Sequence, residues 1–275
     1  MANVIECPMQ AGFYPDVPFA DYLKWPLLSQ SVLKQGSKSM AHLKAALDEE
    51  IKKEPTDEMI LGSALHTTFL EPELAAMRIA LWTGGTRRGE KWDAFEIENA
   101  GKYILTENMH EKLVGMVRAL RRHKVIREWA GRIEHVEYSG IAQVHGVMMK
   151  GRIDALTPDP LFDLKKVVSG DPFLFRKTAW SFGYHIQAFV YRRIFNRDRF
   201  ILATVEENPP YDVLAYELTD TLSARGEREA MALLQRVQWC QKNKVWPGRS
   251  DDIMPLDVPA FAQDEVTTVA DFFSS

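Results

Sequence analysis

Two aspartates and a lysine lie close together in the segment GRIDALTPDPLFDLKK, which spans residues 151–166. Asp154 ends one apolar run, and Asp163 and Lys165 end the next one. If the two runs are neighbouring strands joined by the turn Thr157–Pro160, the two aspartates come close together across the pair. Two carboxylates at that separation repel each other unless a cation lies between them. The segment therefore predicts a divalent-metal site.

Strand geometry also selects the lysine that serves this site. Residues two apart on a strand share a face, so Asp163 and Lys165 point into one site, while Lys166 points to the opposite face. A bound Mg²⁺ would lower the pKa of a water molecule and neutralise charge on a phosphodiester, and Lys165 would orient the nucleophile or balance the developing charge. The predicted chemistry is phosphodiester hydrolysis.

Length and composition restrict the class of protein. The 275 residues are 46% hydrophobic, which suffices for a large core. No apolar run approaches the roughly 20 residues that span a bilayer, and the N-terminus shows no signal peptide, so we expect a cytoplasmic protein. Cys7 and Cys240 are the only cysteines, and two thiolates cannot hold an iron–sulfur cluster or a structural zinc ion. The metal site should therefore use hard oxygen ligands.

The formal net charge of -4 is unusual for a protein that binds nucleic acid nonspecifically. Basic residues nevertheless cluster locally, and solvated helix faces would explain such clusters equally well. Their proximity to the carboxylate segment favours a basic channel. The clusters are Arg118, Arg121, Arg122 and Lys124; Arg176 and Lys177; and Arg192, Arg193, Arg197 and Arg199.

Hydrophobic periodicity predicts an α/β protein with one mixed sheet and helices on both faces. We expect an N-terminal helical and loop-rich extension over residues 1–56, a core over 57–245 and a tail over 246–275. Predicted helices cover 29–33, 39–50, 58–70 (capped by Asp57), 91–100, 107–124, a short segment from Pro172, 184–195 and a last helix from its cap Thr219 to about 244. Predicted strands cover 133–139, 142–156 after a turn at Gly140, 161–167, 200–206 and 213–218.

Four short motifs occur in a characteristic order: GSALH at 62–66, GRID at 151–154, DLK at 163–165 and QAFVY at 187–191. With these motifs the chain resembles the PD-(D/E)XK nuclease superfamily, and within it the RecE-type phage and prophage exonucleases, which are related to the RecB nuclease domain. The resemblance covers roughly Leu28 to Leu218. It implies a restriction-endonuclease-like core, a central mixed sheet flanked by helices.

The resemblance also implies roles for individual residues. Asp154, Asp163 and Lys165 would be catalytic, and His66, both aspartates and the Leu164 carbonyl would hold the metal. Supporting positions would be Gln187, Tyr191 and Glu137.

Several of these residues also fit structural roles. His66 alone on an apolar helix would fit a hydrogen-bonded core histidine, and Gln187 and Tyr191 could simply pack their helix on the sheet. We expect the aromatic rings of Trp180, Phe182 and Tyr184 in the core rather than as base-stacking platforms. Candidate contacts to DNA are Arg87, Arg88, Lys91, Arg152 and Lys177.

By resemblance, the expected activity is a Mg²⁺-dependent exonuclease, with Mn²⁺ as a substitute, that degrades linear double-stranded DNA from 5′ to 3′ and leaves a 3′ single strand for recombination. A ring-shaped homo-oligomer (trimer or tetramer) and a single-strand annealing protein are the expected partners, in a bacterial cell carrying a phage or prophage. A RecB-like endonuclease and a catalytically silent DNA-end-binding protein remain as alternatives.

Overall fold

The structure is a computed structural model that describes residues 5–48 and 55–257. Its strands are β1 Gly12–Tyr14, β2 Leu28–Ser29, β3 Ile79–Trp82, β4 Tyr103–Thr106, β5 His135–Val144, β6 Val147–Leu156, β7 Leu161–Val167, β8 Phe200–Glu206 and β9 Val213–Glu217. Its helices are α1 Phe19–Lys24, α2 Gln30–Leu33, the 3-10 helix η1 Lys34–Ser37, α3 Met40–Leu47, α4 Asp57–Leu70, α5 Pro72–Arg78, α6 Glu90–Glu98, α7 Glu107–Arg122, α8 Lys124–Ala130, α9 Pro172–Ser181, α10 Tyr184–Phe195 and α11 Asp220–Asn243.

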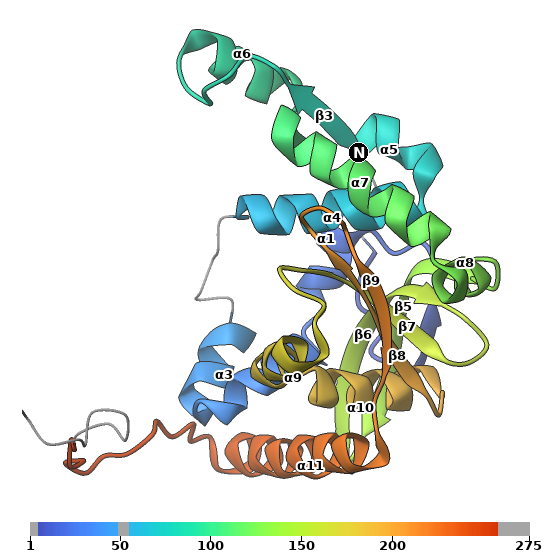
Figure 1. Cartoon of the computed structure of the whole chain (residues 1–275). Helices are drawn as coiled ribbons and strands as arrows, with labels where there is room; N and C mark the ends of the chain where they lie inside the picture. Colours follow the sequence, from blue (N-terminus) through green and yellow to red (C-terminus); the bar gives the residue numbers. More distant parts are fainter. Residues whose placement is uncertain (1–4, 49–54, 258–275) are drawn as a thin grey trace, which may run out of the picture.

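A seven-stranded mixed sheet forms the centre, in the order β1-β5-β6-β7-β8-β9, with β2 pairing with β6. Helices cover both faces, as the periodicity predicts (Figure 1). One apolar core packs α4, α7 and α8 against the sheet, and the other packs α10 and α11 against it. The parallel pair β7–β8 is joined through α9 and α10, which is the crossover that a parallel connection requires.

The sheet opens between β6 and β7. These strands share a single antiparallel pair, Ala155 with Phe162, next to the turn that joins them. The next residues on each strand are Asp154 and Asp163, so both predicted carboxylates stand where the strands begin to diverge. Without continuous hydrogen bonding there, side chains from a neighbouring element can enter between the strands, and we call this opening the fork.

The predicted turn at Gly140 is wrong, because β5 runs unbroken through Gly140 and the hairpin turns at His145-Gly146. Gly140 is needed for close packing instead: a Cβ there would lie 2.8 Å from Ile194 Cγ2 on α10. Both turn residues have positive φ, 46° and 79°, as a two-residue hairpin turn of matching twist requires. A glycine inside a strand therefore marks the approach of a helix, not a reversal of the chain.

The described part of the N-terminal segment is built into the same sheet. β1 pairs with β5, and β2 runs parallel to β6. The buried Lys150 ammonium donates to the carbonyls of Tyr22, Leu23 and Trp25 at 2.7–3.0 Å, which fixes the end of α1. This segment therefore forms a wall beside the fork.

Most predicted helices are confirmed to within a few residues, and the cap of one of them is corrected. Thr56 caps α4 through its hydroxyl, which accepts the Met59 N–H, and Asp57 is the first helical residue rather than the cap. Part of the predicted 39–50 helix, residues 49 and 50, lies outside the described residues, as does the tail after 257. Sequence reasoning missed the short parallel pair β3–β4, from which α6 projects (Figure 1).

The expectation that Trp180 and Phe182 lie in the core is wrong. Their side chains are 50% and 55% exposed, whereas Tyr184 is half-buried. Both residues lie where α9 ends and the chain turns into α10. The faces of the two helices that contact the core carry other residues, such as Phe175, Ala179 and Ile186. Within the described residues, no helix is both long enough and apolar enough to cross a bilayer.

Candidate active site

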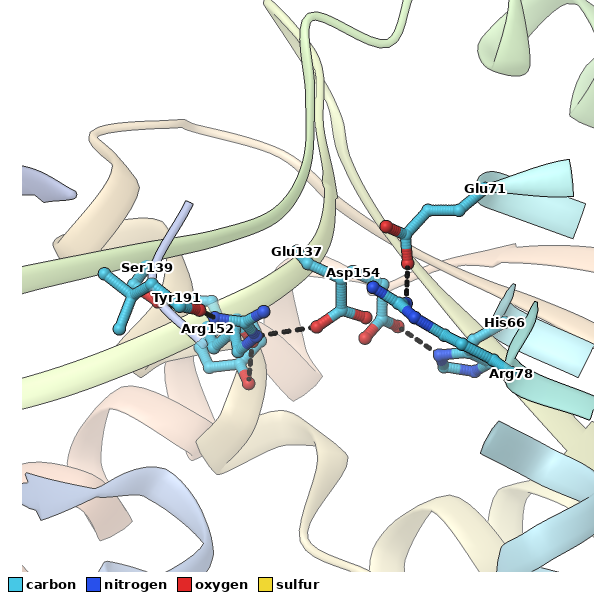
Figure 2. A network of polar contacts seen from close by, with 9 residues as sticks. His66, Glu71, Arg78, Glu137, Ser139, Arg152, Asp154 and Tyr191 are labelled. Carbon is cyan, nitrogen blue, oxygen red and sulfur yellow. Dashed lines mark hydrogen bonds and ion pairs between the residues drawn. The ribbon is translucent and has the colours of Figure 1, made fainter. Parts of the chain in front are cut away.

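Three side chains meet at the fork with geometry that suits a metal ion. Ligand atoms of His66, Glu137 and Asp154 lie within 4.8 Å of one another, and Figure 2 shows the two carboxylates side by side with the imidazole facing Asp154. They come from α4, β5 and β6. Asp154, which strand alternation predicted, therefore lies beside the helix residue His66 and a second carboxylate, Glu137.

His66 bridges both strands of the fork. Its Nδ1 lies 3.4 Å from Asp154 Oδ2, and its Nε2 lies 3.0 Å from the Leu164 carbonyl oxygen. Burial alone would lower the pKa of His66, but the Asp154 carboxylate outweighs burial and raises that pKa to about 9. The protonated ring donates to the Leu164 carbonyl and forms an ion pair with Asp154, so His66 stands between the carboxylate and the carbonyl predicted as ligands.

Glu137 reaches the site through an unusual backbone conformation. Its φ is 51° inside a strand, a left-handed geometry that costs a non-glycine residue about 1 kcal/mol or more and that collects at functional sites. The Arg152 Nε donates to Glu137 Oε2 at 2.6 Å, and burial with the nearby Asp154 charge raises the pKa of Glu137. The sequence signal for Glu137 was its match to an acidic position of the family that the chain resembles, and in the structure the β5–β6 register sets it opposite Asp154.

Asp163 and Lys165 share one face of β7, as predicted. The Lys165 Nζ lies 2.5 Å from Asp163 Oδ2, and the Gln187 side chain donates to Asp163 Oδ1 at 2.6 Å. Burial raises the pKa of Asp163, and so does the charge of Asp154. Burial alone would lower the pKa of Lys165, but the carboxylate of Asp163 raises it to about 12. Lys165 is therefore an ammonium at neutral pH and acts as a hydrogen-bond donor, not as a base.

The remaining motif residues hold the site in place. Tyr191 donates from its hydroxyl to the Arg152 carbonyl at 2.8 Å, which fixes the backbone of β6 beside Asp154. Lys166 points away from the site and pairs with Glu207, as strand alternation predicts. Gln187 therefore contacts the site directly, whereas Tyr191 acts on a neighbouring strand.

The donor set fits a divalent cation. Asp154 Oδ2 and Asp163 Oδ2 are buried and accept no hydrogen bond among the described residues, although each lies beside a cationic side chain. Buried carboxylate oxygens in that state are costly unless charge is supplied nearby. The two carboxylates of Glu137 and Asp154 and the His66 imidazole come within 4.8 Å of one another, a mainly oxygen donor set of the kind that Mg²⁺ and Mn²⁺ accept. The predicted ligand Asp163 is not part of this group and pairs with Lys165 instead.

A large groove of about 1560 Å³ opens beside the candidate metal site formed by His66, Glu137 and Asp154. Its walls come from the N-terminal segment on one side and from α4 and α5 on the other, and Asp154 and Glu137 line it. Arg78 in the wall pairs with Glu71 at 2.7 Å (Figure 2). The groove gives an extended substrate access to the carboxylates.

The predicted DNA contacts fall in different places. Arg152 is engaged by Glu137, by the Val17 carbonyl and by Ser139, so its guanidinium fixes the groove wall. Arg87 pairs with Asp57, whereas Arg88 and Lys91 are exposed in the lobe around α6. Lys177 is exposed on α9 above the Phe173 ring.

The basic clusters do not line the groove. None of the clustered arginines and lysines is among the described residues of its walls. Arg193 and Arg199 pair with Glu227 and Glu217. Among the described residues, those clusters therefore do not supply basic walls to this groove.

Sequence reasoning missed two residues next to Lys165. The Tyr184 ring centroid lies 4.9 Å from Lys165 Nζ, and Lys34 on η1 interacts electrostatically with Lys165 and Asp163. Tyr184 lies three residues before Gln187 on the same predicted helix, so the sequence could have indicated that its ring lies near the site. Lys34 had none, because its approach depends on tertiary packing.

Comparisons with known proteins agree with this arrangement. The family model described as "PDDEXK-like domain of unknown function (DUF3799)" matches residues 29–257. The fold is similar to that of a solved structure, a "Putative exonuclease" from Eubacterium rectale, with a TM-score of 0.57 and 14% identity over 85% of this chain and 91% of that chain. The structure of SSO0001 has a TM-score of only 0.26, with 15% identity over 69% of this chain and 98% of that chain, and supports no inference. No curated protein matches the sequence significantly.

Proposed function

The chain belongs to the PDDEXK-like domain family, which makes it a nuclease by fold, and we propose that it is a Mg²⁺-dependent exonuclease acting on linear double-stranded DNA. One observation carries the proposal: Asp154 and Glu137 converge with His66 at the fork, and the Asp163–Lys165 ion pair lies on the neighbouring strand. The solved neighbour described as an exonuclease supports the exonuclease assignment by fold only. We further propose a 5′ to 3′ direction, 3′ overhangs that serve strand annealing, and a ring-shaped assembly in the cytoplasm.

Each side chain has a distinct role in this proposal. Asp154, Asp163, Glu137, His66 and the Leu164 carbonyl would hold the ion, which when bound lowers the pKa of a water molecule and neutralises charge on the scissile phosphate. The Lys165 ammonium donates hydrogen bonds to the attacking oxygen or to a phosphate oxygen as negative charge develops.

The supporting residues preserve that geometry. Gln187 holds one oxygen of Asp163, and the other oxygen pairs with Lys165. Arg152 orients Glu137 through its Nε. The side chains are thus placed before substrate binds, which lowers the cost of organising them in the transition state.

Digestion of a linear duplex labelled at the 5′ end or at the 3′ end, in Mg²⁺ and in Mn²⁺, tests enzyme, substrate and direction together. We expect release of the 5′ label first and no cleavage of covalently closed circles. Lys165→Met should lose activity by about 10²–10³-fold, whereas Lys166→Met is the matched control and should retain it. Cleavage of circles would instead assign an endonuclease, and tight binding without cleavage would assign a DNA-end-binding protein.

A further inference from the structure

The segment that follows the catalytic strand exposes an unusual number of aromatic rings. Among the described residues, six phenylalanine and tryptophan side chains are largely exposed, and Phe173, Trp180 and Phe182 are three of them. These three residues lie within a stretch of ten residues, on α9 and directly after its C-terminal end (Figure 1). Isolated exposed rings are common, but a group beside a catalytic strand indicates a binding surface.

Phe182 is connected to the catalytic lysine by one intervening ring. Lys165 Nζ lies 4.9 Å from the Tyr184 ring centroid. The Tyr184 ring stacks on Phe182, with centroids 5.8 Å apart and an interplanar angle of 16°. Phe182 is 55% exposed whereas Tyr184 is half-buried. The outer ring therefore offers an open surface one aromatic layer away from the site of chemistry.

Lys34 brings a second ammonium to the same place. Its Nζ donates to the Phe182 carbonyl at 3.2 Å, which ties η1 to the turn between α9 and α10. Burial and the positive charge of Lys165 lower the pKa of Lys34, and the Asp163 carboxylate raises it. Because its Nζ contacts the Phe182 carbonyl, Lys34 places a cation beside the exposed ring, where it can bind the phosphate of a nucleotide stacked there.

We propose that Phe182 and Lys34 form a binding site for one unpaired nucleotide next to the scissile bond: the Phe182 ring stacks on its base, and the Lys34 ammonium binds its phosphate. The inference rests on the proposed nuclease function and adds the state of its substrate, a strand that is single at the site. Aromatic stacking with a lysine on the backbone tolerates any sequence, as a processive exonuclease requires. An apolar protein partner would not need the ammonium.

The stacking half is tested with Phe182→Ala, Phe182→Trp and the matched control Trp239→Ala, whose ring is 53% exposed on α11. Phe182→Ala should raise KM for a linear duplex about tenfold, and Phe182→Trp should restore it. One abasic residue next to the scissile bond should cause a similar loss in the wild type and no further loss in Phe182→Ala. Equal losses at Phe182 and Trp239, or additive losses with the abasic residue, would overturn the stacking role.

The phosphate half is tested by the salt dependence of single-stranded oligonucleotide binding, measured in Ca²⁺ to prevent cleavage. Lys34→Met should reduce the slope of log K against log salt concentration by about 0.7, whereas Lys34→Arg and Phe182→Ala should keep the wild-type slope. An unchanged slope in Lys34→Met overturns the phosphate contact. Thermal unfolding of each variant confirms that it is folded. Failure of the wild type to cleave any DNA would refute the proposed function, whereas a cleaving wild type with unaffected Phe182 and Lys34 variants would refute only this inference.

Discussion

Replacing Gly151 by alanine tests how closely α10 must approach the strand that carries Asp154. A Cβ on Gly151 would lie 2.9 Å from Ile194 Cδ1, about 0.5 Å inside an ordinary contact of 3.4 Å. Ile194 is 3% exposed, so its side chain has little room to move. Overpacking of this kind costs about 1–3 kcal/mol, against a gain of about 0.4–1 kcal/mol from a less flexible unfolded chain. We expect Gly151→Ala to lower the free energy of unfolding by about 1–2 kcal/mol.

The atom in contact makes the prediction specific. Ile194→Val removes Cδ1 and keeps Cγ2, so it should rescue Gly151→Ala, and the double variant should be about as stable as Ile194→Val alone. The matched control is Gly140→Ala, whose new Cβ would meet Ile194 Cγ2 at 2.8 Å and which Ile194→Val should not rescue. Urea unfolding of the wild type, the three single variants and the two double variants gives the coupling energies, for which contacting residues show about 0.5–3 kcal/mol. Additive effects in the Gly151 cycle, or equal rescue of both glycine variants, would refute the packing described.

Three further predictions concern the site and its wall. Mn²⁺ at 100 times its Kd should add about 2.7 kcal/mol to the free energy of unfolding, or about 5–10 °C in Tm, and Asp154→Asn should abolish this shift in a thermal unfolding assay. In the metal-free protein the pKa of His66 is raised to about 9. The contribution of His66 to the free energy of unfolding is therefore complete below about pH 6.5 and is lost as pH rises through 9. Urea unfolding between these pH values should show the decline in the wild type and not in His66→Gln. Lys150→Met should lower the free energy of unfolding by about 2–4 kcal/mol, because three carbonyls lose a charged donor, and a change below 0.5 kcal/mol would contradict this role.

Local pattern sufficed where one strand or helix face decides the outcome. Alternation along β7 separated Lys165 from Lys166, and the two ion pairs bear this out. It failed where a distant element decides: Gly140 is a strand residue because α10 lies against it, and the true turn begins with His145, which carries no strong turn signal.

The solvent exposure of aromatic side chains was the other feature that sequence reasoning predicted poorly. Phenylalanine is a residue type typical of protein cores. The sequence does not show that other residues of α9 and α10 already fill the core beside Phe182. Lys34 reaches Phe182 across 148 positions, a separation over which periodicity has no information. Strand alternation therefore predicted the shared face of Asp163 and Lys165, whereas the surroundings of the site depend on tertiary packing.

The position of His66 has a consequence for motion. His66 lies on α4, whereas the carboxylates lie on strands, so an ion bound at the fork would link the helical layer to the sheet. Local separation of α4 would then release the ion, and bound metal should slow amide hydrogen exchange in α4 more than in α11, which has no ligand. A metal bound in this arrangement would act as a reversible cross-link between layers, and the dynamics of α4 would govern how long the site stays assembled.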